Sequence, residues 1–124
     1  MGKLLITLIF LLAGFAFPVE LVAYYNPDCK CCHKYFKLLE EKGYKVKRNE
    51  VDSDTLFRKK DELGVPVDMR SCHTMVVDGK FVEGHVPTEG IEALLKDKSA
   101  RGVYSPHGTL SGWGMEEKEF YLIR

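Results

Sequence analysis

The sequence of 124 residues predicts one α/β domain of three layers, with the element order β-α-β-α-β-β-α and a glycine-rich C-terminal tail. Three features support this prediction. Apolar or alternating segments take turns with segments of helical spacing from residue 20 to residue 97. An Asp-Gly pair at 78–79 is the strongest hairpin indication in the chain. A composition of 45% hydrophobic and 29% charged residues is typical of a globular protein, and the length suits one domain.

The first elements form a predicted β-α-β unit. Residues 20–25 (ELVAYY) are mostly apolar and rich in β-formers, so they predict a strand. The turn at 26–28 breaks it, and Asp28 is expected to cap a helix that ends before Gly43. Residues 44–51 begin with alternating apolar and charged side chains, which predicts a strand with one face in water.

A second helix and a hairpin follow. Asp52 or Ser53 is expected to cap the helix, which Gly64 ends. Residues 74–77 (TMVV) predict a strand, and the Asp-Gly turn returns the chain antiparallel over residues 80–83.

Thr88 is expected to cap a third helix that runs to about Lys96. Residues 98–124 are rich in glycine and show no clear period before 119–123, so they predict a loop that orders around a ligand, with a short last strand. A β-α-β unit followed by a hairpin and a helix is the thioredoxin-like arrangement, and the first two helices supply the right-handed crossovers that it needs.

The first residues have the pattern of a secretory signal peptide. Lys3 gives a positive start, and residues 4–17 form a nearly uninterrupted apolar run that is too short to span a membrane as a helix. Gly14 and Ala16 are small residues at the −3 and −1 positions of a cleavage site. Residues 1–16 are therefore predicted to be removed, which leaves a periplasmic or secreted protein with no membrane segment. A buried first element or an uncleaved membrane tether are the alternatives.

The charges balance. Lysine plus arginine and aspartate plus glutamate number 18 each, which gives no electrostatic case for binding nucleic acid or an anionic membrane. The cluster of basic residues at 58–60 is expected on a solvated helix face. The mature chain divides into a predicted thioredoxin-like metal-binding domain at 17–97 and a C-terminal loop or tail at 98–124 that packs near the site.

Three of the four cysteines lie within four positions, at Cys29, Cys31 and Cys32. The first turn of a helix stabilises thiolates, which are both the nucleophilic form of cysteine and the metal-binding form. Cys29 and Cys32 are three residues apart and share one helix face, whereas Cys31 is expected to point elsewhere unless this turn is distorted. Cys72, just before the TMVV strand, is the expected fourth thiol.

Further candidate ligands surround these cysteines. His73 takes the place where glutaredoxin-like chains carry a cis-proline, so Cys72 and His73 replace a substrate-docking loop by two potential ligands. His85 follows a glycine at another position near such a site, and Met115 lies in a glycine segment that can fold over it, with His107 not far away in sequence. Sulfur ligands select Cu(I), zinc or iron–sulfur clusters, so this set favours a soft metal.

Three other interpretations of the cysteines stay open. Structural disulfides would leave the thiols without chemistry, although a vicinal Cys31–Cys32 bridge would strain the backbone. Dithiol chemistry would use Cys29 as the attacking thiol and Cys32 as the resolving one. A zinc site of Cys₃His type ranks last, because the paired spacing of zinc fingers is absent.

Several motifs together resemble the CopG-type periplasmic copper proteins, a family long filed as a domain of unknown function. They are NPDCKCC at 26–32, LGVP at 63–66, SCHT at 71–74, EGHVP at 83–87, ARG at 100–102 and GME at 114–116. The resemblance covers nearly the whole mature chain. The chain departs from the family at 106–108, where Pro-His-Gly replaces the usual Pro-Gly-Met.

The resemblance implies a thioredoxin-like fold that binds copper in export-linked copper resistance, with a redox role for the copper. Copper ions, and other copper-resistance proteins, are then the expected partners. The family's four cysteines correspond to Cys29, Cys31, Cys32 and Cys72, which are the expected primary ligands. Its C-terminal methionine corresponds to Met115, which forms a second tier with His73 and His85. We therefore expect an exported protein that holds Cu(I) in a multi-copper thiolate cluster. A thioredoxin-type thiol–disulfide oxidoreductase that uses Cys29 and Cys32 is the alternative.

Overall fold

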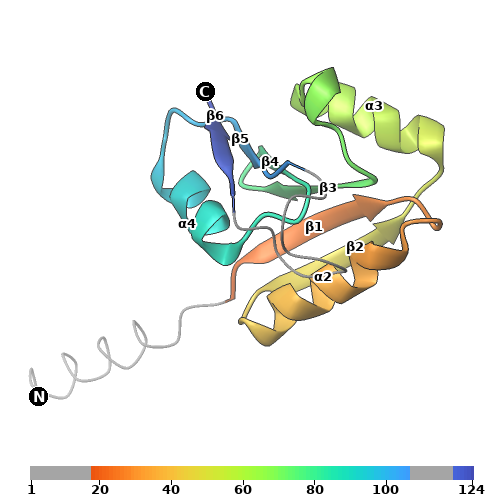
Figure 1. Ribbon diagram of the computed structural model, residues 1–124, viewed down its shortest axis with the longest axis horizontal. Coiled ribbons are helices and arrows are strands. Elements are labelled where there is room, and N and C mark those ends of the chain that lie inside the picture. The colour runs from red at the N-terminus through yellow and green to blue at the C-terminus, as the bar shows by residue number, and fades with distance from the viewer. Residues whose placement is uncertain (1–17, 107–118) are drawn as a thin grey trace, which may run out of the picture.

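The computed structural model describes residues 18–106 and 119–124, and these residues form one mixed β-sheet with helices on both faces (Figure 1). The sheet order is β2-β1-β3-β4-β5-β6. The strands are β1 (Glu20–Tyr25), β2 (Lys45–Glu50), β3 (His73–Val77), β4 (Lys80–Glu83), β5 (Gly102–Tyr104) and β6 (Tyr121–Ile123). The helices are α2 (Lys30–Glu41), α3 (Ser53–Leu63) and α4 (Thr88–Lys96), with a 3-10 turn, η1 (Val67–Met69).

The strand directions bring the end of β1 and the start of β3 to the same end of the sheet. β1 pairs in parallel with β2 and antiparallel with β3, and β3 and β4 form a hairpin. β4 then pairs in parallel with β5, which pairs antiparallel with β6. Figure 1 shows α2 and α4 below the sheet and α3 above it. The order along the chain begins with the predicted β-α-β-α-β-β-α, and the mixed α/β class is confirmed. The thioredoxin-like classification stays a prediction.

The main core lies between the sheet and the two helices below it. Alternate residues of β1, β3 and β4 pack there against apolar side chains of α2 and α4. The fully buried members of this set include Leu21, Tyr35, Phe36, Met75 and Leu94. The opposite pleat of β3 and β4, with Thr74 and Glu83, faces α3.

Turn residues act as predicted at several element ends. The carboxylate of Asp52 accepts the Thr55 N–H at 2.7 Å and so caps α3. Gly64 ends α3 with φ of 74°, a left-handed conformation that favours glycine. Asp78 and Gly79 have φ of 55° and 72°, so both central residues of the β3–β4 turn are left-handed, as a tight hairpin requires.

Two predicted caps are wrong. Cys29, not Asp28, is the N-cap of α2, and no side chain there bonds to the helix. Asp28 instead donates its backbone N–H to Asn26 Oδ1 at 2.9 Å, because the Asn-Pro-Asp turn satisfies its own backbone. Thr88 is the first residue of α4, and the N-cap is Pro87, whose fixed extended backbone ends the preceding segment.

The sequence does not predict β5. Three residues are too few for a period, and Gly102 carries no side chain that would mark a strand. β5 forms because α4 acts as the crossover between two parallel strands, β4 and β5. The predicted short strand near 119–123 is present as β6.

The predicted leader at 1–16 lies outside the described residues, as do His107 and Met115. Within the described part of the chain, every helix is too short or too polar to cross a membrane.

Asp97, at the end of α4, forms a pH-dependent contact with Arg124, the residue that follows β6. Hydrogen bonds from Ser99, with help from Arg124, lower the pKa of Asp97 to about 2. A carboxylate with a lowered pKa stabilises the fold above its ordinary pKa, and this contribution disappears as the pH falls through the lowered value. We therefore expect Asp97→Asn to lower the melting temperature of metal-free protein at pH 6 and to have little effect near pH 2.

Thermal unfolding at both pH values tests this expectation. Asp68→Asn, at an exposed aspartate of η1 that takes part in no ion pair among the described residues, is the matched control and should change little at either pH. An equal loss of melting temperature for Asp97→Asn at both pH values would contradict the account.

Candidate metal centre

Three cysteines lie between the end of β1 and the first turn of α2. β1 ends at Tyr25, a short turn follows, and Cys29 starts the helix with a non-helical backbone (φ −81°, ψ 84°). Cys32 is fully buried in the first turn of α2, Cys29 is nearly so, and Cys31 is partly exposed. The unpaired N–H groups of a helix start favour thiolates over thiols, so this placement suits metal binding and nucleophilic chemistry alike.

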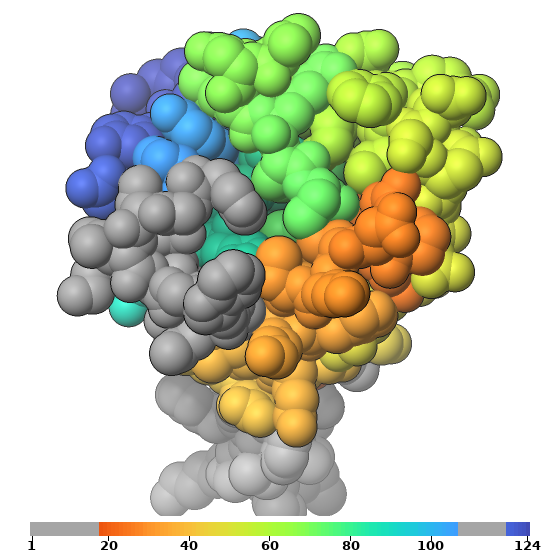
Figure 2. Space-filling view, turned by 45° about the vertical axis from the view of Figure 1, so that its right-hand side comes forward, coloured from red at the N-terminus to blue at the C-terminus, as the bar shows by residue number. Residues whose placement is uncertain are grey.

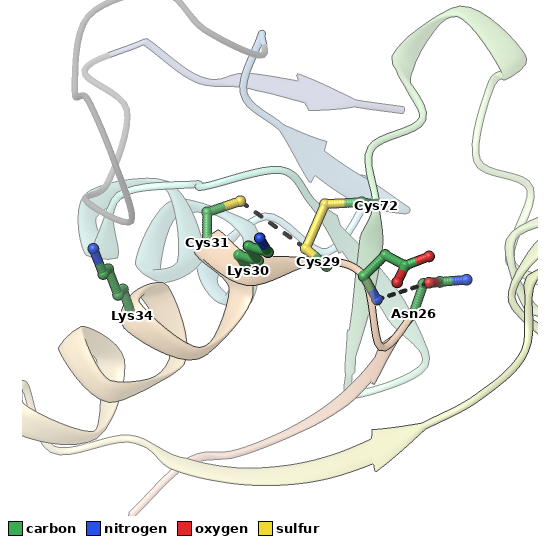
Figure 3. A pocket seen from close by; sticks show the side chains of 7 residues that line it. Asn26, Cys29, Lys30, Cys31, Lys34 and Cys72 are labelled. Atoms are coloured by element: carbon green, nitrogen blue, oxygen red, sulfur yellow. Dashed lines mark hydrogen bonds between the residues drawn. A yellow bond between two sulfur atoms is a disulfide. The ribbon is translucent and has the colours of Figure 1, made fainter.

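Cys72 reaches the same point from another part of the chain, the segment between η1 and β3. Its Sγ is 3.8 Å from the Sγ of Cys32. The Sγ atoms of Cys29, Cys31, Cys32 and Cys72 all lie within 4.8 Å of one another. Figure 3 shows the Cys31 and Cys72 side chains pointing toward Cys29 from opposite sides.

Cys31 joins the other thiols because the start of α2 is distorted, which is the exception to its expected direction. The Cys29 backbone is not helical, so the helical spacing rule does not hold across it, and the Sγ atoms of Cys29 and Cys31 are 4.0 Å apart. The four sulfurs therefore form one group, contributed by two separate segments.

Cys29 is in disulfide contact with both Cys32 and Cys72. A sulfur forms one disulfide at a time, so the two bonds are alternatives. The Cα–Cα distances are 5.5 Å to Cys32 and 6.0 Å to Cys72, and both lie within the range that disulfides need. Cys31 belongs to neither pair. The backbone thus lets Cys29 bond to either neighbour.

His73 contacts the sulfur group directly. Its ring is fully buried, with Nδ1 3.4 Å from Cys32 Sγ and Nε2 3.2 Å from the Gly84 carbonyl oxygen. A carbonyl accepts only from a protonated nitrogen, so Nε2 carries the hydrogen, and in a neutral ring Nδ1 turns its lone pair to Cys32. Nδ1 of His73 can therefore accept a hydrogen bond from the Cys32 thiol whenever Cys32 is not in a disulfide.

His85 lies farther from the sulfurs. Its buried ring stacks on Tyr35, with centroids 4.7 Å apart, and lies 5.5 Å from the His73 ring. The structure thus brings the four predicted cysteines together, keeps His73 against one of them, and places His85 next to His73. The predicted ligand Met115 lies outside the described residues.

A pocket of about 410 Å³ gives access to the sulfurs from one side of the molecule. It is lined by Asn26, Asp28, Cys29, Lys30, Cys31, Lys34 and Cys72 (Figure 3). Figure 2 shows the orange residues near position 30 beside the green residues near position 70 on this face. Cys29, Cys31 and Cys72 therefore line one pocket among the described residues.

Sequence reasoning missed a buried ion pair next to the site. Lys60 of α3 is 2% exposed and Glu83 of β4 is 0% exposed, and Lys60 Nζ lies 2.5 Å from Glu83 Oε2. The expectation that Lys60 lies on a solvated face is wrong. The helical spacing does indicate that Lys60 is buried, because Lys60 lies one turn after the buried Leu56. Burial raises the pKa of Glu83 and lowers that of Lys60, and their mutual attraction opposes both shifts.

The chain is similar to known proteins in both sequence and structure. Residues 69–115 match a family described as a protein of unknown function, DUF411. Two solved structures, described as copper resistance protein CopG forms 2 and 1, superpose with TM-scores of 0.72 each. They are 39% and 37% identical to this chain, over 82% of it and over 81% and 80% of their own chains. No match is found among curated proteins.

The disulfide geometry predicts how the metal-free protein oxidises. We expect one disulfide per chain, always including Cys29, and a Cys31 thiol that stays open to alkylation. Cys31→Ser should leave the disulfide content unchanged, because neither pairing of Cys29 uses Cys31. Peptide mapping of alkylated, unreduced protein measures this, with fully reduced protein as the control. A disulfide that includes Cys31 in the wild type would contradict the prediction.

Proposed function

The chain belongs to the family of the copper resistance protein CopG, and on that basis we propose that it is an exported protein that holds Cu(I) through the thiolates of Cys29, Cys31, Cys32 and Cys72. The observation that carries the proposal is the convergence of four sulfurs within 4.8 Å at an open pocket. Soft thiolates select soft ions, and Cu(I) is the softest of the ions that such a site takes in proteins. A thiolate can bridge two ions, so the cluster holds several copper ions.

A second tier of ligands completes this proposal. His73 holds the lone pair of its Nδ1 toward Cys32, and this nitrogen would take a place on a copper ion bound at that sulfur. His85 follows behind it, and the thioether of Met115 is a donor of the right softness in the tail. The four cysteines come first because only they meet at one point within the described residues.

The proposal extends to copper redox chemistry. Two thiolates that join as a disulfide release two electrons, which reduce two Cu(II) ions to Cu(I). Cys29 with either Cys32 or Cys72 has the spacing for this bond. The predicted leader at 1–16 places this chemistry in the periplasm or outside the cell, where thiols not held by metal tend to oxidise. Other copper-resistance proteins are the proposed partners.

A thiol–disulfide oxidoreductase is the second candidate function. Cys29 and Cys32 begin a helix at disulfide spacing, which supports it. His73 stands against it, since it fills the position where a substrate-docking cis-proline is expected, and the described residues contain no cis peptide bond. The copper function is therefore the first candidate.

Anaerobic Cu(I) titration of reduced, leaderless protein tests the first candidate. We expect several bound ions by elemental analysis, and fewer in Cys31→Ser and in Cys72→Ser, because each removes one bridging sulfur. His33→Ala is the matched control. His33 is an exposed histidine of α2 whose ring nitrogen contacts Arg48 and not the sulfurs, so this substitution should leave the copper count unchanged. An unchanged count in both cysteine variants would contradict the shared cluster.

Insulin reduction separates the second candidate from the first. We expect metal-free, reduced protein and its Cys29→Ser variant to reduce insulin at the same low rate. Fast turnover by the wild type that disappears in Cys29→Ser would instead favour dithiol exchange as the function.

A further inference from the structure

We infer that Lys60 and Glu83 are positioning residues for the fourth sulfur of the site. Their buried ion pair fixes the segment 71–74 and so determines where Cys72 lies relative to the three cysteines of α2. The copper part of this inference depends on the proposed function. The part that concerns disulfide pairing does not, because it requires no metal.

The ion pair binds the Cys72 segment on both sides of the cysteine. Glu83 Oε2 accepts the backbone N–H of Ser71 at 2.6 Å, and Glu83 Oε1 accepts the hydroxyl of Thr74. Lys60 Nζ donates to the His73 carbonyl oxygen at 2.8 Å and to Thr74 Oγ1 at 3.2 Å, besides its bond to Glu83. All three ammonium protons are thus used, and two of them go to residues of this segment.

Cys72 is the sulfur that needs such positioning. Cys29, Cys31 and Cys32 belong to one helix start, so local backbone geometry fixes their spacing. Cys72 comes from a segment whose position depends on contacts with α3 and β4. Its Cα is 6.0 Å from that of Cys29, and disulfides rarely span more than about 7 Å, so a shift of little more than 1 Å would take it out of reach.

Stability alone does not account for the pair. A buried ion pair costs desolvation and is often no more stabilising than apolar residues of similar size. What apolar residues cannot do here is accept the N–H of Ser71, which lies outside every helix and strand, or donate to the His73 carbonyl. The pair therefore serves the placement of residues 71–74.

Glu83→Gln tests the inference, because glutamine keeps the size but offers one acceptor oxygen for donors that now use two. In metal-free, oxidised protein we expect the ratio of Cys29–Cys72 to Cys29–Cys32 disulfide to fall about tenfold, as hydrogen bonds to a charged carboxylate are lost. Peptide mapping of unreduced protein measures the ratio. Glu62→Gln, which removes the ion pair of Glu62 with the partly exposed Lys59 of the same helix, should leave it unchanged.

A second control separates positioning from lost stability. Leu94→Ala opens a cavity in α4, away from the Cys72 segment, and should lower the melting temperature without changing the disulfide ratio. Should Glu83→Gln fail to fold, Thr74→Val removes the hydroxyl that joins this segment to Lys60 and Glu83 and should shift the ratio in the same direction by less. An unchanged ratio in the folded variant, or a Leu94→Ala shift equal to that of Glu83→Gln, would overturn the inference.

Copper affinity gives an independent arm. If the proposed function holds, Glu83→Gln should weaken Cu(I) binding about 10- to 100-fold, the usual effect of removing a residue that orients a ligand. A wild type that retains no copper would contradict the proposed function and leave the disulfide result standing. A shift in the disulfide ratio with unchanged copper affinity would refute only the copper part.

Discussion

The antiparallel pairing of β1 with β3 is the constraint on which the site depends. Its register places Tyr25, the last residue of β1, opposite His73, the first residue of β3. The chain leaves β1 toward Cys29 and enters β3 from Cys72, so this pairing brings two cysteines that are 43 residues apart in the sequence to the same end of the sheet. A slip of one residue would turn His73 to the opposite face of the sheet and move Cys72 away from α2.

The two faces of the sheet divide the work of the site. Below the sheet, His73 points into the core with α2 and approaches Cys32. Above it, Thr74 and Glu83 point to α3, where Lys60 holds them. His73 and Thr74 are adjacent in β3, and the side chains of a strand alternate between the two faces of its sheet. His73 therefore contacts the sulfur site on one face, and Thr74 contacts the buried ion pair on the other.

Much of this arrangement was predictable from the sequence, because turn residues and hydrophobic spacing are local properties. Asp52, Gly64 and the Asp78-Gly79 turn mark their element ends correctly, and the clustered cysteines with Cys72 indicate the site. What failed depends on contacts between distant segments. Lys60 of α3 is buried because Glu83 faces it from β4, and β5 forms because α4 returns the chain beside β4.

X-ray absorption at the copper edge of reduced, copper-loaded protein tests the central claim most directly, because it reports the oxidation state and the ligand atoms together. The account predicts a Cu(I) edge and a first coordination shell dominated by sulfur, with the sulfur contribution reduced in Cys72→Ser. A Cu(II) edge, or a shell dominated by nitrogen and oxygen, would contradict a thiolate copper site built from the four cysteines.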